Sequence, residues 1–366
     1  MFDLSQFLES GTRGVVRQLG RSSGLGVRQW GTLLQWGWAT SRAAARRRAL
    51  ARQGELAPAF LIASITESCN LACDGCYSRA QGTRPEGPRS SPLTASRWGE
   101  LFAEARRLGV SFILLAGGEP LTRPDVLAKA ARFPDLLFPV FTNGTLLRGD
   151  LVTFFARHRH LIPLISLEGR QDRTDHRRAA GVYERVVQTM DLLAARSLLF
   201  GTSITVTVEN LDEVTSASFF QELHHRGCRA AVFVEFVPVS AQTWPLVLRE
   251  PQRLVLRQRL DDLQRQFPRA LFVTFPGDEA ASGGCLAAGR GFFHIGPDGA
   301  AEPCPFSPHS DLSLRDHSLR EALKSPLFRK VAEAGLLQVG HAGGCALVEQ
   351  DAKVVGWSAS RTGRGC

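Results

Sequence analysis

Three cysteines lie within eight residues of one another near the start of the main body of the chain. Cys69, Cys73 and Cys76 form the pattern C-x-x-x-C-x-x-C, and Tyr77 follows directly. Three thiolates on one loop can hold three irons of a cubane iron–sulfur cluster and leave the fourth iron without a protein ligand. An open iron can bind a small molecule and do chemistry, whereas a fully ligated cluster mainly transfers electrons.

Three other interpretations of these cysteines are open. A structural zinc ion needs four ligands, and no fourth Cys or His lies near the motif. A redox C-x-x-C would use Cys73 and Cys76 and leave Cys69 unexplained. The third is a chance grouping of buried thiols. The motif follows a predicted strand, however, which is where parallel barrels place their active sites.

A second motif, Gly117-Gly118-Glu119-Pro120, follows the next predicted strand. Together with C-x-x-x-C-x-x-C-Y it resembles the radical S-adenosylmethionine (radical SAM) superfamily, over roughly residues 58–350. The resemblance implies a [4Fe–4S] cluster on the three cysteines whose open iron chelates SAM. Electron transfer then breaks a C–S bond, and the resulting 5′-deoxyadenosyl radical abstracts hydrogen from a substrate. It also implies that the Gly-Gly-Glu-Pro segment binds the SAM amino group.

Polar residues at the ends of the third and fourth predicted strands resemble family segments that line the SAM pocket. They are Asn143, Ser166 and Glu168. Their side chains could bond the ribose hydroxyls and the methionine carboxylate, or they could serve only as turn and capping residues. Glu168 stands where many relatives have Asp, which would move its contact from SAM to substrate. Arg178, further along, could pair with a carboxylate.

A second set of cysteines, Cys285, Cys304 and Cys345, lies near the C-terminus. The pattern C-x13-G-x4-C from Cys285 to Cys304 resembles the entry motif of SPASM and twitch domains, which implies one auxiliary [4Fe–4S] cluster. The fourth ligand is left open between Cys366, His341, a substrate group and none. Buried free cysteines and a zinc site are the alternatives. The segment between Cys285 and Cys304 predicts a β-hairpin.

Short β-rich runs alternate with helical segments from residue 58 onward, which predicts a parallel sheet with right-handed crossovers. Six such units, with the resemblance, imply an α/β fold with an open, TIM-like (β/α)6 partial barrel. A small α+β cysteine-bearing domain of the twitch or SPASM type is expected to follow. The expected parts are a basic helical extension (1–57), the radical SAM core (58–245), a bridging helix (246–274) and the auxiliary-cluster domain (275–366).

The positive charge is concentrated at the N-terminus. The whole chain carries +9, and residues 1–57 hold nine arginines against three acidic residues, a net of +6. The main body is therefore not expected to bind nucleic acid. Val27, Trp30, Leu34 and Trp38 recur at helical spacing, and this stripe could pack on the barrel, lie on an anionic membrane surface or dock an acidic partner. No signal peptide is apparent, so a cytoplasmic location is expected.

The resemblance implies a radical SAM enzyme that acts on a peptide by crosslinking, oxidation or epimerisation and receives electrons from a flavodoxin or ferredoxin. A dehydrogenase or cofactor-building enzyme acting on a small molecule is the first alternative. A non-catalytic electron-transfer protein is the second, although it would not need the Gly-Gly-Glu-Pro segment. No catalytic residue is assigned, and Cys228 is interpreted as a small buried hydrophobic residue rather than a hydrogen-atom donor.

Overall fold

The structure is a computed structural model that describes residue 14 and residues 27–82, 91–238, 240–275, 282–338 and 345–358. Its described strands form one sheet in the order β7-β6-β5-β4-β3-β2-β1-β8-β9. All neighbours pair in parallel except β8 and β9, which form a hairpin. The strands are β1 (Phe60–Thr66), β2 (Phe112–Gly117), β3 (Phe138–Thr142), β4 (Leu161–Leu167), β5 (Gly201–Val206), β6 (Ala230–Glu235), β7 (Leu271–Phe275), β8 (His294–Ile295) and β9 (Ala301–Glu302).

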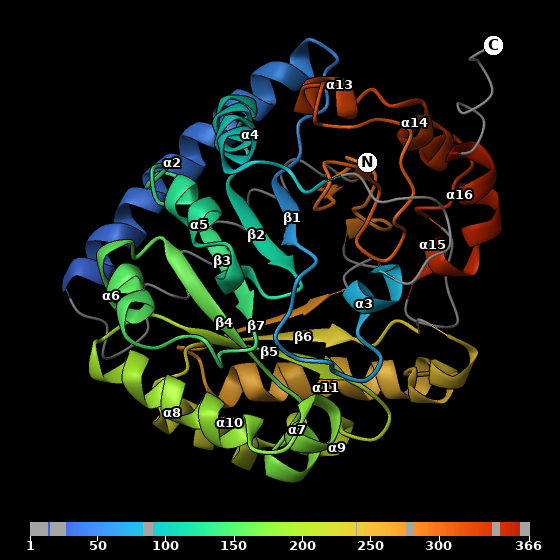
Figure 1. Ribbon diagram of the computed structural model, residues 1–366. Coiled ribbons are helices and arrows are strands. Elements are labelled where there is room, and N and C mark those ends of the chain that lie inside the picture. The colour runs from blue at the N-terminus through green and yellow to red at the C-terminus, as the bar shows by residue number, and fades with distance from the viewer. Residues whose placement is uncertain are drawn as a thin grey trace.

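Helices cover the outer face of this curved sheet, and the C-terminal segment lies beside β1 where the curve is open (Figure 1). The arrangement confirms the expected open partial barrel of alternating strands and helices. The helices are α2 (Val27–Arg52), α3 (Tyr77–Gly82), α4 (Ala95–Leu108), α5 (Pro124–Ala130), α6 (Asp150–Arg157), α7 (Gln171–Arg178), α8 (Val182–Ala195), α9 (Leu211–Val214), α10 (Ala217–His225), α11 (Glu250–Gln266), α13 (Leu319–Ala322), α14 (Pro326–Glu333), α15 (Ala346–Glu349) and α16 (Asp351–Ser358), with 3-10 turns η1 (Pro120–Thr122) and η2 (Ala241–Leu246).

The sheet continues past the six predicted strands. After α11 the chain returns as β7, which pairs in parallel with β6. On the other edge, β8 pairs in parallel with β1, so the predicted hairpin extends the sheet of the barrel. The short length of β8 and β9, two residues each, explains why periodicity alone predicted a hairpin but not its place in the sheet.

Helix α4 illustrates how local sequence builds the outer layer. The Thr94 side chain accepts a hydrogen bond from the Arg97 backbone at the N-terminus, and Gly109 ends the helix with φ of 85°. Such a left-handed ending favours glycine. Apolar side chains at helical spacing form the buried face. They are Trp98, Leu101, Phe102, Ala105 and Leu108.

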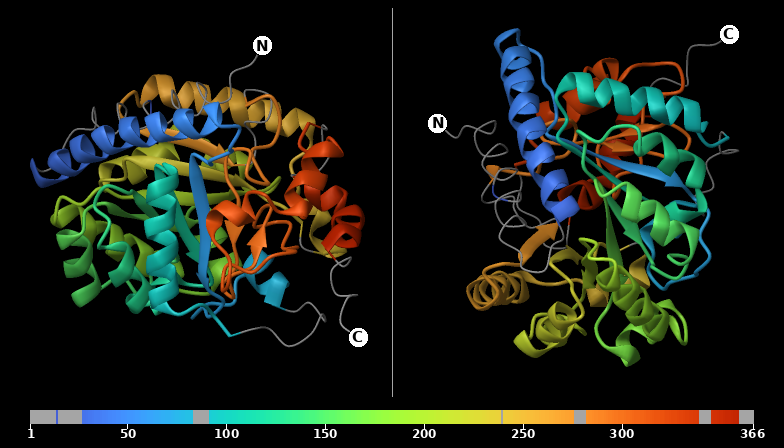
Figure 2. Two further views of the ribbon diagram at one scale, coloured as in Figure 1. Left: turned by 90° about the horizontal axis from the view of Figure 1, so that it is seen from above. Right: turned by 90° about the vertical axis from the view of Figure 1, so that its left-hand side faces the viewer.

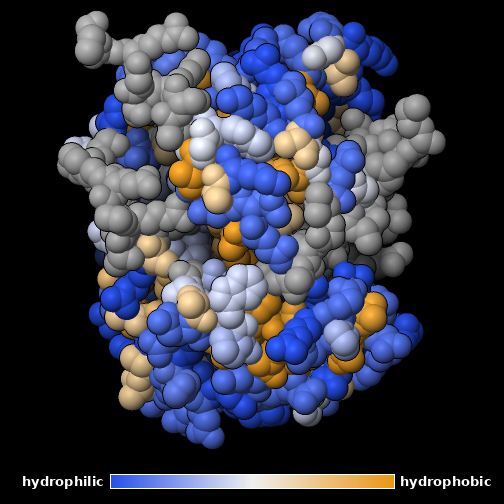
Figure 3. Space-filling view, turned by 90° about the vertical axis from the view of Figure 1, so that its right-hand side faces the viewer, coloured by the Kyte–Doolittle hydropathy of each residue, from blue (hydrophilic) through white to orange (hydrophobic). Residues whose placement is uncertain are grey.

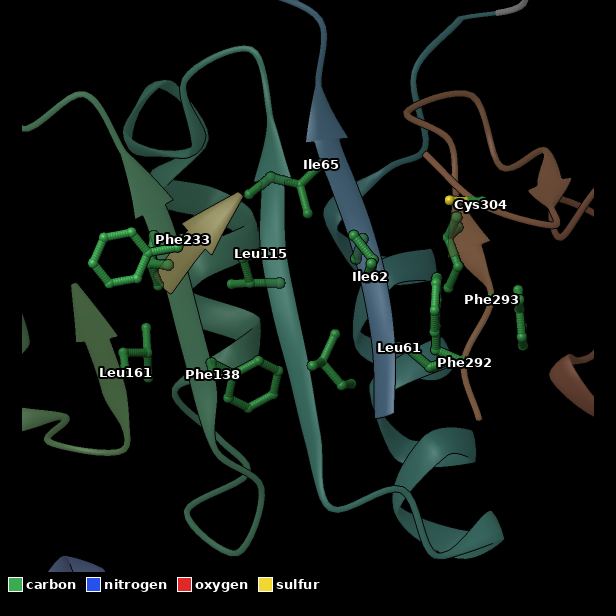
Figure 4. Close-up of a cluster of buried hydrophobic side chains, with 14 of the residues drawn as sticks. Leu61, Ile62, Ile65, Leu115, Phe138, Leu161, Phe233, Phe292, Phe293 and Cys304 are labelled. Carbon is green, nitrogen blue, oxygen red and sulfur yellow. The ribbon is translucent and has the colours of Figure 1, made fainter. Parts of the chain in front are cut away.

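The main core fills the inside of the curved sheet and its contact with the surrounding helices. Side chains of β1, β2, β3 and β6 meet there, and Phe292, Phe293 and Cys304 of the C-terminal segment lie beside β1 in the same cluster (Figure 4). The C-terminal segment therefore shares a continuous apolar core with the barrel. Burial of this kind stabilises by about 25 cal/mol per Å² of apolar surface.

Helix α2 packs across the N-terminal ends of the barrel strands, on the opposite end from the predicted site (Figure 2). Leu33 and Trp36 are buried there, and the Trp36 indole donates a hydrogen bond of 3.0 Å to the Ser111 carbonyl. Arg47 also donates to the Gly109 carbonyl. The residues that pack against Leu33 and Trp36 lie at or just before the beginnings of strands. They are Phe112, Leu137, Ile162, Leu199 and Leu271.

The predicted apolar stripe on this helix does not pack on the barrel. Val27 is 88% exposed, Leu34 61% and Trp38 70%, and Trp30 is also exposed. Of the three alternatives for this stripe, packing on the barrel is therefore wrong. The helix instead buries Gln29, Leu33, Trp36 and Thr40, because these side chains face the strand ends and form hydrogen bonds there or fill the space.

No helix in the described ranges is long and apolar enough to span a membrane. The face that carries the C-terminal helices is mostly hydrophilic, with hydrophobic side chains gathered in its lower half (Figure 3).

Candidate active site

The cysteine loop leaves the carboxyl end of β1 and turns into α3. Cys69 is exposed, and Cys73 and Cys76 are half-buried. The loop is held from the side by the end of α7, because the Asp74 amide donates to the Arg177 carbonyl at 3.0 Å and the Arg177 guanidinium donates to the Asp74 carbonyl at 3.1 Å. Gly75 takes a φ of +63° against the Phe236 ring, a conformation that favours glycine.

The charge around the loop favours a cationic metal centre. Burial raises the pKa of Cys69, and Glu119 and the two other cysteines raise it further. Burial also raises the pKa of Cys73, although Arg178 and Arg177 oppose this shift. With their pKa raised in this way, the Cys69 and Cys73 thiols lose their protons readily only when a metal supplies positive charge.

The Gly-Gly-Glu-Pro segment lies against the start of the cysteine loop. The Gly118 amide donates to the Thr66 carbonyl and the Glu119 amide to the Ser68 carbonyl, both at 2.8 Å. A Cβ atom on Gly118 would overlap the Ser68 carbonyl oxygen. Glycine is therefore required by the close approach of two backbones, which places this segment directly beside the cysteines.

The Glu119 carboxylate is fully buried and already bonded. It accepts hydrogen bonds from the Thr142 hydroxyl at 2.8 Å, the Asn143 backbone amide at 2.8 Å and the Leu121 backbone amide at 3.0 Å. Burial raises the pKa of Glu119, and these donors oppose the shift. The carboxylate thus connects the end of β2 to the end of β3.

Asn143 links the end of β3 to the cysteine loop. Its side-chain amide nitrogen donates a hydrogen bond to the Asn70 side-chain oxygen at 2.9 Å and lies 3.9 Å from the Cys69 sulfur. Its oxygen accepts from Thr145, whose hydroxyl in turn accepts from Asn70 at 2.8 Å. Asn70, to which the sequence pattern assigned no role, is thus a positioning residue, and its place inside the cysteine motif was the available signal.

Glu168, at the end of β4, carries a buried carboxylate with one free oxygen. Its Oε1 accepts from Arg177 at 2.7 Å and from Arg178 at 2.5 Å. Its Oε2 is buried without a hydrogen-bond partner among the described residues. A buried carboxylate oxygen without a donor is costly, so this atom is suited to a donor from a bound ligand. Ser166, two residues earlier, is half-buried.

These residues fit a cluster with bound SAM. Cysteine thiols, a glycine segment with backbone acceptors and an unpaired carboxylate oxygen converge at the ends of β1, β2, β3 and β4. Within the described ranges, no three His, Cys, Asp or Glu side chains are placed to share one metal ion.

Residues 63–220 match the family model described as the radical SAM superfamily. The chain contains a radical SAM domain. It is 26% identical to the AdoMet-dependent heme synthase of Methanosarcina barkeri over 321 residues, covering 80% of this chain and 89% of that protein. It is also 26% identical to the mycofactocin maturase MftC of Mycobacterium ulcerans over 302 residues, or 76% and 78% of the two chains.

The fold also resembles solved structures at low sequence identity. Streptococcus suis SuiB bound to the precursor peptide SuiA superposes with a TM-score of 0.62 at 15% identity, covering 84% of this chain and 74% of SuiB. The relatives are enzymes that modify peptides or small molecules, so this radical SAM chain is an enzyme. Its family implies a [4Fe–4S] cluster and SAM.

The second cysteine set of this radical SAM protein also converges in space. Cys304 and Cys345 are buried and their thiols are hydrogen-bonded to each other, while Cys285 is half-buried nearby. Burial and these two neighbours raise the pKa of Cys304 well above its ordinary value. Of the proposed fourth ligands, Cys366 and His341 lie outside the described residues.

A buried polar network, which the sequence pattern did not reveal, lies between the two cysteine sets. The Tyr77 hydroxyl bonds Ser64, Ser64 bonds His294 at 2.8 Å, and His294 bonds Glu302 at 2.6 Å. Tyr77 follows Cys76, and Glu302 precedes Cys304 by two residues. The cross-strand pairing of His294 with Glu302 within the predicted hairpin is the one signal that could have suggested it.

Cys228 lies away from this site. It is fully buried, and its thiol is 3.1 Å from the Ala230 carbonyl at the beginning of β6. Burial raises the pKa of Cys228 to about 11. The strand beginnings are at the end opposite the cysteine loop, so the interpretation of Cys228 as a small buried hydrophobic residue is the one that the position favours.

Proposed function

We propose that this enzyme reductively cleaves SAM at a [4Fe–4S] cluster on Cys69, Cys73 and Cys76 and modifies a peptide substrate. The observation that carries the proposal is the contact network that joins the cysteine loop to the next strand ends through Asn70 and Asn143. When bound, the cluster and SAM supply a 5′-deoxyadenosyl radical for hydrogen abstraction.

The chain's own residues would bind and orient SAM. The backbone carbonyls of the segment from Gly117 to Pro120 would accept hydrogen bonds from the amino group. Asn143, Ser166 and the free oxygen of Glu168 would bond the polar groups of the sugar and methionine ends. Arg178, beside Glu168 and Cys73, would keep positive charge near the cluster, because these negative neighbours outweigh the effect of its burial and raise its pKa.

The peptide proposal draws on two relatives, the maturase MftC and SuiB with its bound precursor peptide. A small-molecule substrate is the alternative, supported by the likeness to a heme synthase. Electrons would come from a flavodoxin or ferredoxin in the cytoplasm. Competition assays on SAM turnover with short peptides and with porphyrins would separate the two substrate classes.

We also propose one auxiliary [4Fe–4S] cluster on Cys285, Cys304 and Cys345. The convergence of these thiols supports it. The division into an extension (1–57), a core (58–245), a bridging segment (246–274) and a twitch-like region (275–366) is part of the same proposal.

The test is iron and sulfide content after anaerobic reconstitution, measured with 5′-deoxyadenosine formation from SAM under reduction. Two four-iron clusters correspond to about eight irons per chain. About four irons per chain together with 5′-deoxyadenosine formation would support the SAM chemistry but refute the auxiliary cluster. Cys73→Ala is expected to abolish SAM cleavage, and Cys304→Ala is expected to lose only the auxiliary iron.

The outward face of α2 supports a further proposed contact, with an anionic lipid surface. Two exposed tryptophans and two exposed aliphatic residues lie on one side of a helix that has arginines and no acidic residue. Cosedimentation with phosphatidylglycerol vesicles should fall at least tenfold in a Trp30→Ser, Trp38→Ser variant. The exposed Trp244 provides the matched control, since Trp244→Ser should bind normally. Equal loss in both variants, or binding only to an acidic peptide, would contradict the lipid contact.

A further inference from the structure

Ser307 is a fully buried serine whose hydroxyl has no hydrogen-bond partner in the described part of the chain. A buried hydroxyl without a hydrogen-bond partner is unfavourable, and few buried polar groups in native proteins are in this condition. Ser325, another buried serine of the C-terminal segment, donates to Asp311 at 2.6 Å and accepts from the Phe328 amide at 3.2 Å. The unpaired hydroxyl of Ser307 therefore indicates a hydrogen-bond partner outside the described part of the chain.

The backbone places this hydroxyl beside Cys304. The Ser307 amide donates to the Cys304 carbonyl at 3.0 Å, and the two residues form an antiparallel bridge across a tight turn. Residues directly opposite each other in such a bridge point to the same face, with Cβ atoms about 5 Å apart. The Ser307 hydroxyl and the Cys304 thiol thus lie on one side of the turn.

That side of the turn faces the second cysteine set. The Cys304 thiol is hydrogen-bonded to the Cys345 thiol and interacts electrostatically with Cys285. His309, the next polar side chain after Ser307, is bonded to Asp351 at 2.6 Å. The serine hydroxyl is thus a neutral donor at the edge of three thiols.

We propose that Ser307 donates a hydrogen bond to a sulfur atom of the metal centre held by Cys285, Cys304 and Cys345, and thereby raises its reduction potential. The inference rests on the proposed auxiliary cluster. Reduction adds negative charge to the cluster, and a donor at sulfur stabilises that charge. The unpaired hydroxyl is explained because its partner belongs to the cluster and not to the protein.

The experiment compares Ser307→Ala with wild type in the full chain, in a Cys73→Ala background so that only the auxiliary centre is reduced. Iron content should be unchanged. The midpoint potential in a redox titration followed by electron paramagnetic resonance should become more negative. A tenfold change in the reduction equilibrium, which is about 59 mV for a one-electron couple, is expected. Ser307→Thr, which keeps the hydroxyl, should restore the potential.

Metal-free protein provides a second measurement. There Ser307→Ala should unfold at the same or a higher urea concentration than wild type, because it removes an unsatisfied hydroxyl. The control Ser325→Ala should lower metal-free stability and leave the potential unchanged. An unaltered potential in Ser307→Ala overturns the proposal, and loss of iron overturns it by making Ser307 a ligand. Equal iron content in wild type and Cys304→Ala would instead show that these cysteines hold no auxiliary cluster. That result would refute the proposed cluster and is distinct from a failure of the Ser307 proposal.

Discussion

The hydroxyl of Ser64 lies 2.8 Å from Nε2 of His294, across 230 residues of sequence. This contact joins β1, the strand that leads into the cysteine loop, to β8, the strand that leads towards Cys304. His294 and Ser64 are both buried, and Glu302 completes the network on the other ring nitrogen. The two cysteine sets are therefore held at a set distance by polar contacts inside an apolar core.

His294→Leu should break this network. The substitution leaves the buried Glu302 carboxylate without its ring partner and Ser64 with one contact fewer, and a loss of about 2–3 kcal/mol in the free energy of unfolding is expected. Urea unfolding measures it. The exposed His225 on α10 supplies the control, since His225→Leu should stay within about 0.5 kcal/mol of wild type. A neutral His294→Leu would mean that the network adds nothing to stability.

Gly118→Ala should disturb the cysteine loop without touching a cysteine. The added methyl group would overlap the Ser68 carbonyl oxygen, which directly precedes Cys69. Reconstituted iron at the first motif should fall by about half or more, with a stability loss above about 1 kcal/mol. Gly31→Ala is the matched control, because nothing lies near that position on α2 and a helical alanine stabilises by about 1 kcal/mol. Full iron in Gly118→Ala would contradict the close approach.

Glu168→Gln should weaken SAM binding while the cluster remains. The change removes the negative charge that Arg177 and Arg178 share and replaces the free acceptor oxygen. Charge-assisted hydrogen bonds of this kind contribute about 1.5–3 kcal/mol, so at least tenfold weaker SAM binding is expected in equilibrium dialysis. Glu222→Gln, which alters an exposed carboxylate paired with Arg170, should bind SAM normally. Unchanged affinity would remove Glu168 from the proposed SAM site.

Trp36→Ala and Trp38→Ala should differ sharply although they are two residues apart. Trp36 is 1% exposed and fills the strand beginnings under α2, so its loss should cost about 3–5 kcal/mol. Trp38 is 70% exposed, and its substitution should change stability by less than about 0.5 kcal/mol. Thermal or urea unfolding compares the stabilities of the two variants.

Removal of residues 1–57 should likewise destabilise the barrel, and a truncated chain as stable as wild type would show that α2 is dispensable.

His160 should make the protein sensitive to acid. Burial lowers the pKa of His160 from 6.5 to about 4. The neutral ring therefore contributes stability that is full above pH 6.5 and is lost as the pH falls towards 4, about 3 kcal/mol in all. His160→Gln should flatten the pH dependence of urea unfolding in this range, whereas His225→Gln should not. An equally steep dependence in His160→Gln would assign the effect to other groups.

The residues of the proposed first site lie in motifs that are local in sequence. The cysteine motif, the Gly-Gly-Glu-Pro segment and the alternation of strands and helices each depend on spacing over a few residues. Parallel strands bring their carboxyl ends to one edge of the sheet, so Cys69, Gly118, Asn143 and Glu168 had to approach one another. Local patterns predicted the parallel sheet, and together with the resemblance to the radical SAM superfamily they predicted the open barrel.

Other features depend on which surfaces meet, and spacing does not determine that. Trp30 and Trp36 lie on the same helix, but only Trp36 packs against the strand beginnings. The bond between Ser64 and His294, and the burial of Ser307 beside Cys304, likewise arise from contacts between segments far apart or from a turn too short to show periodicity. Packing of the whole chain decided these relationships, since each depends on a partner that local sequence does not specify.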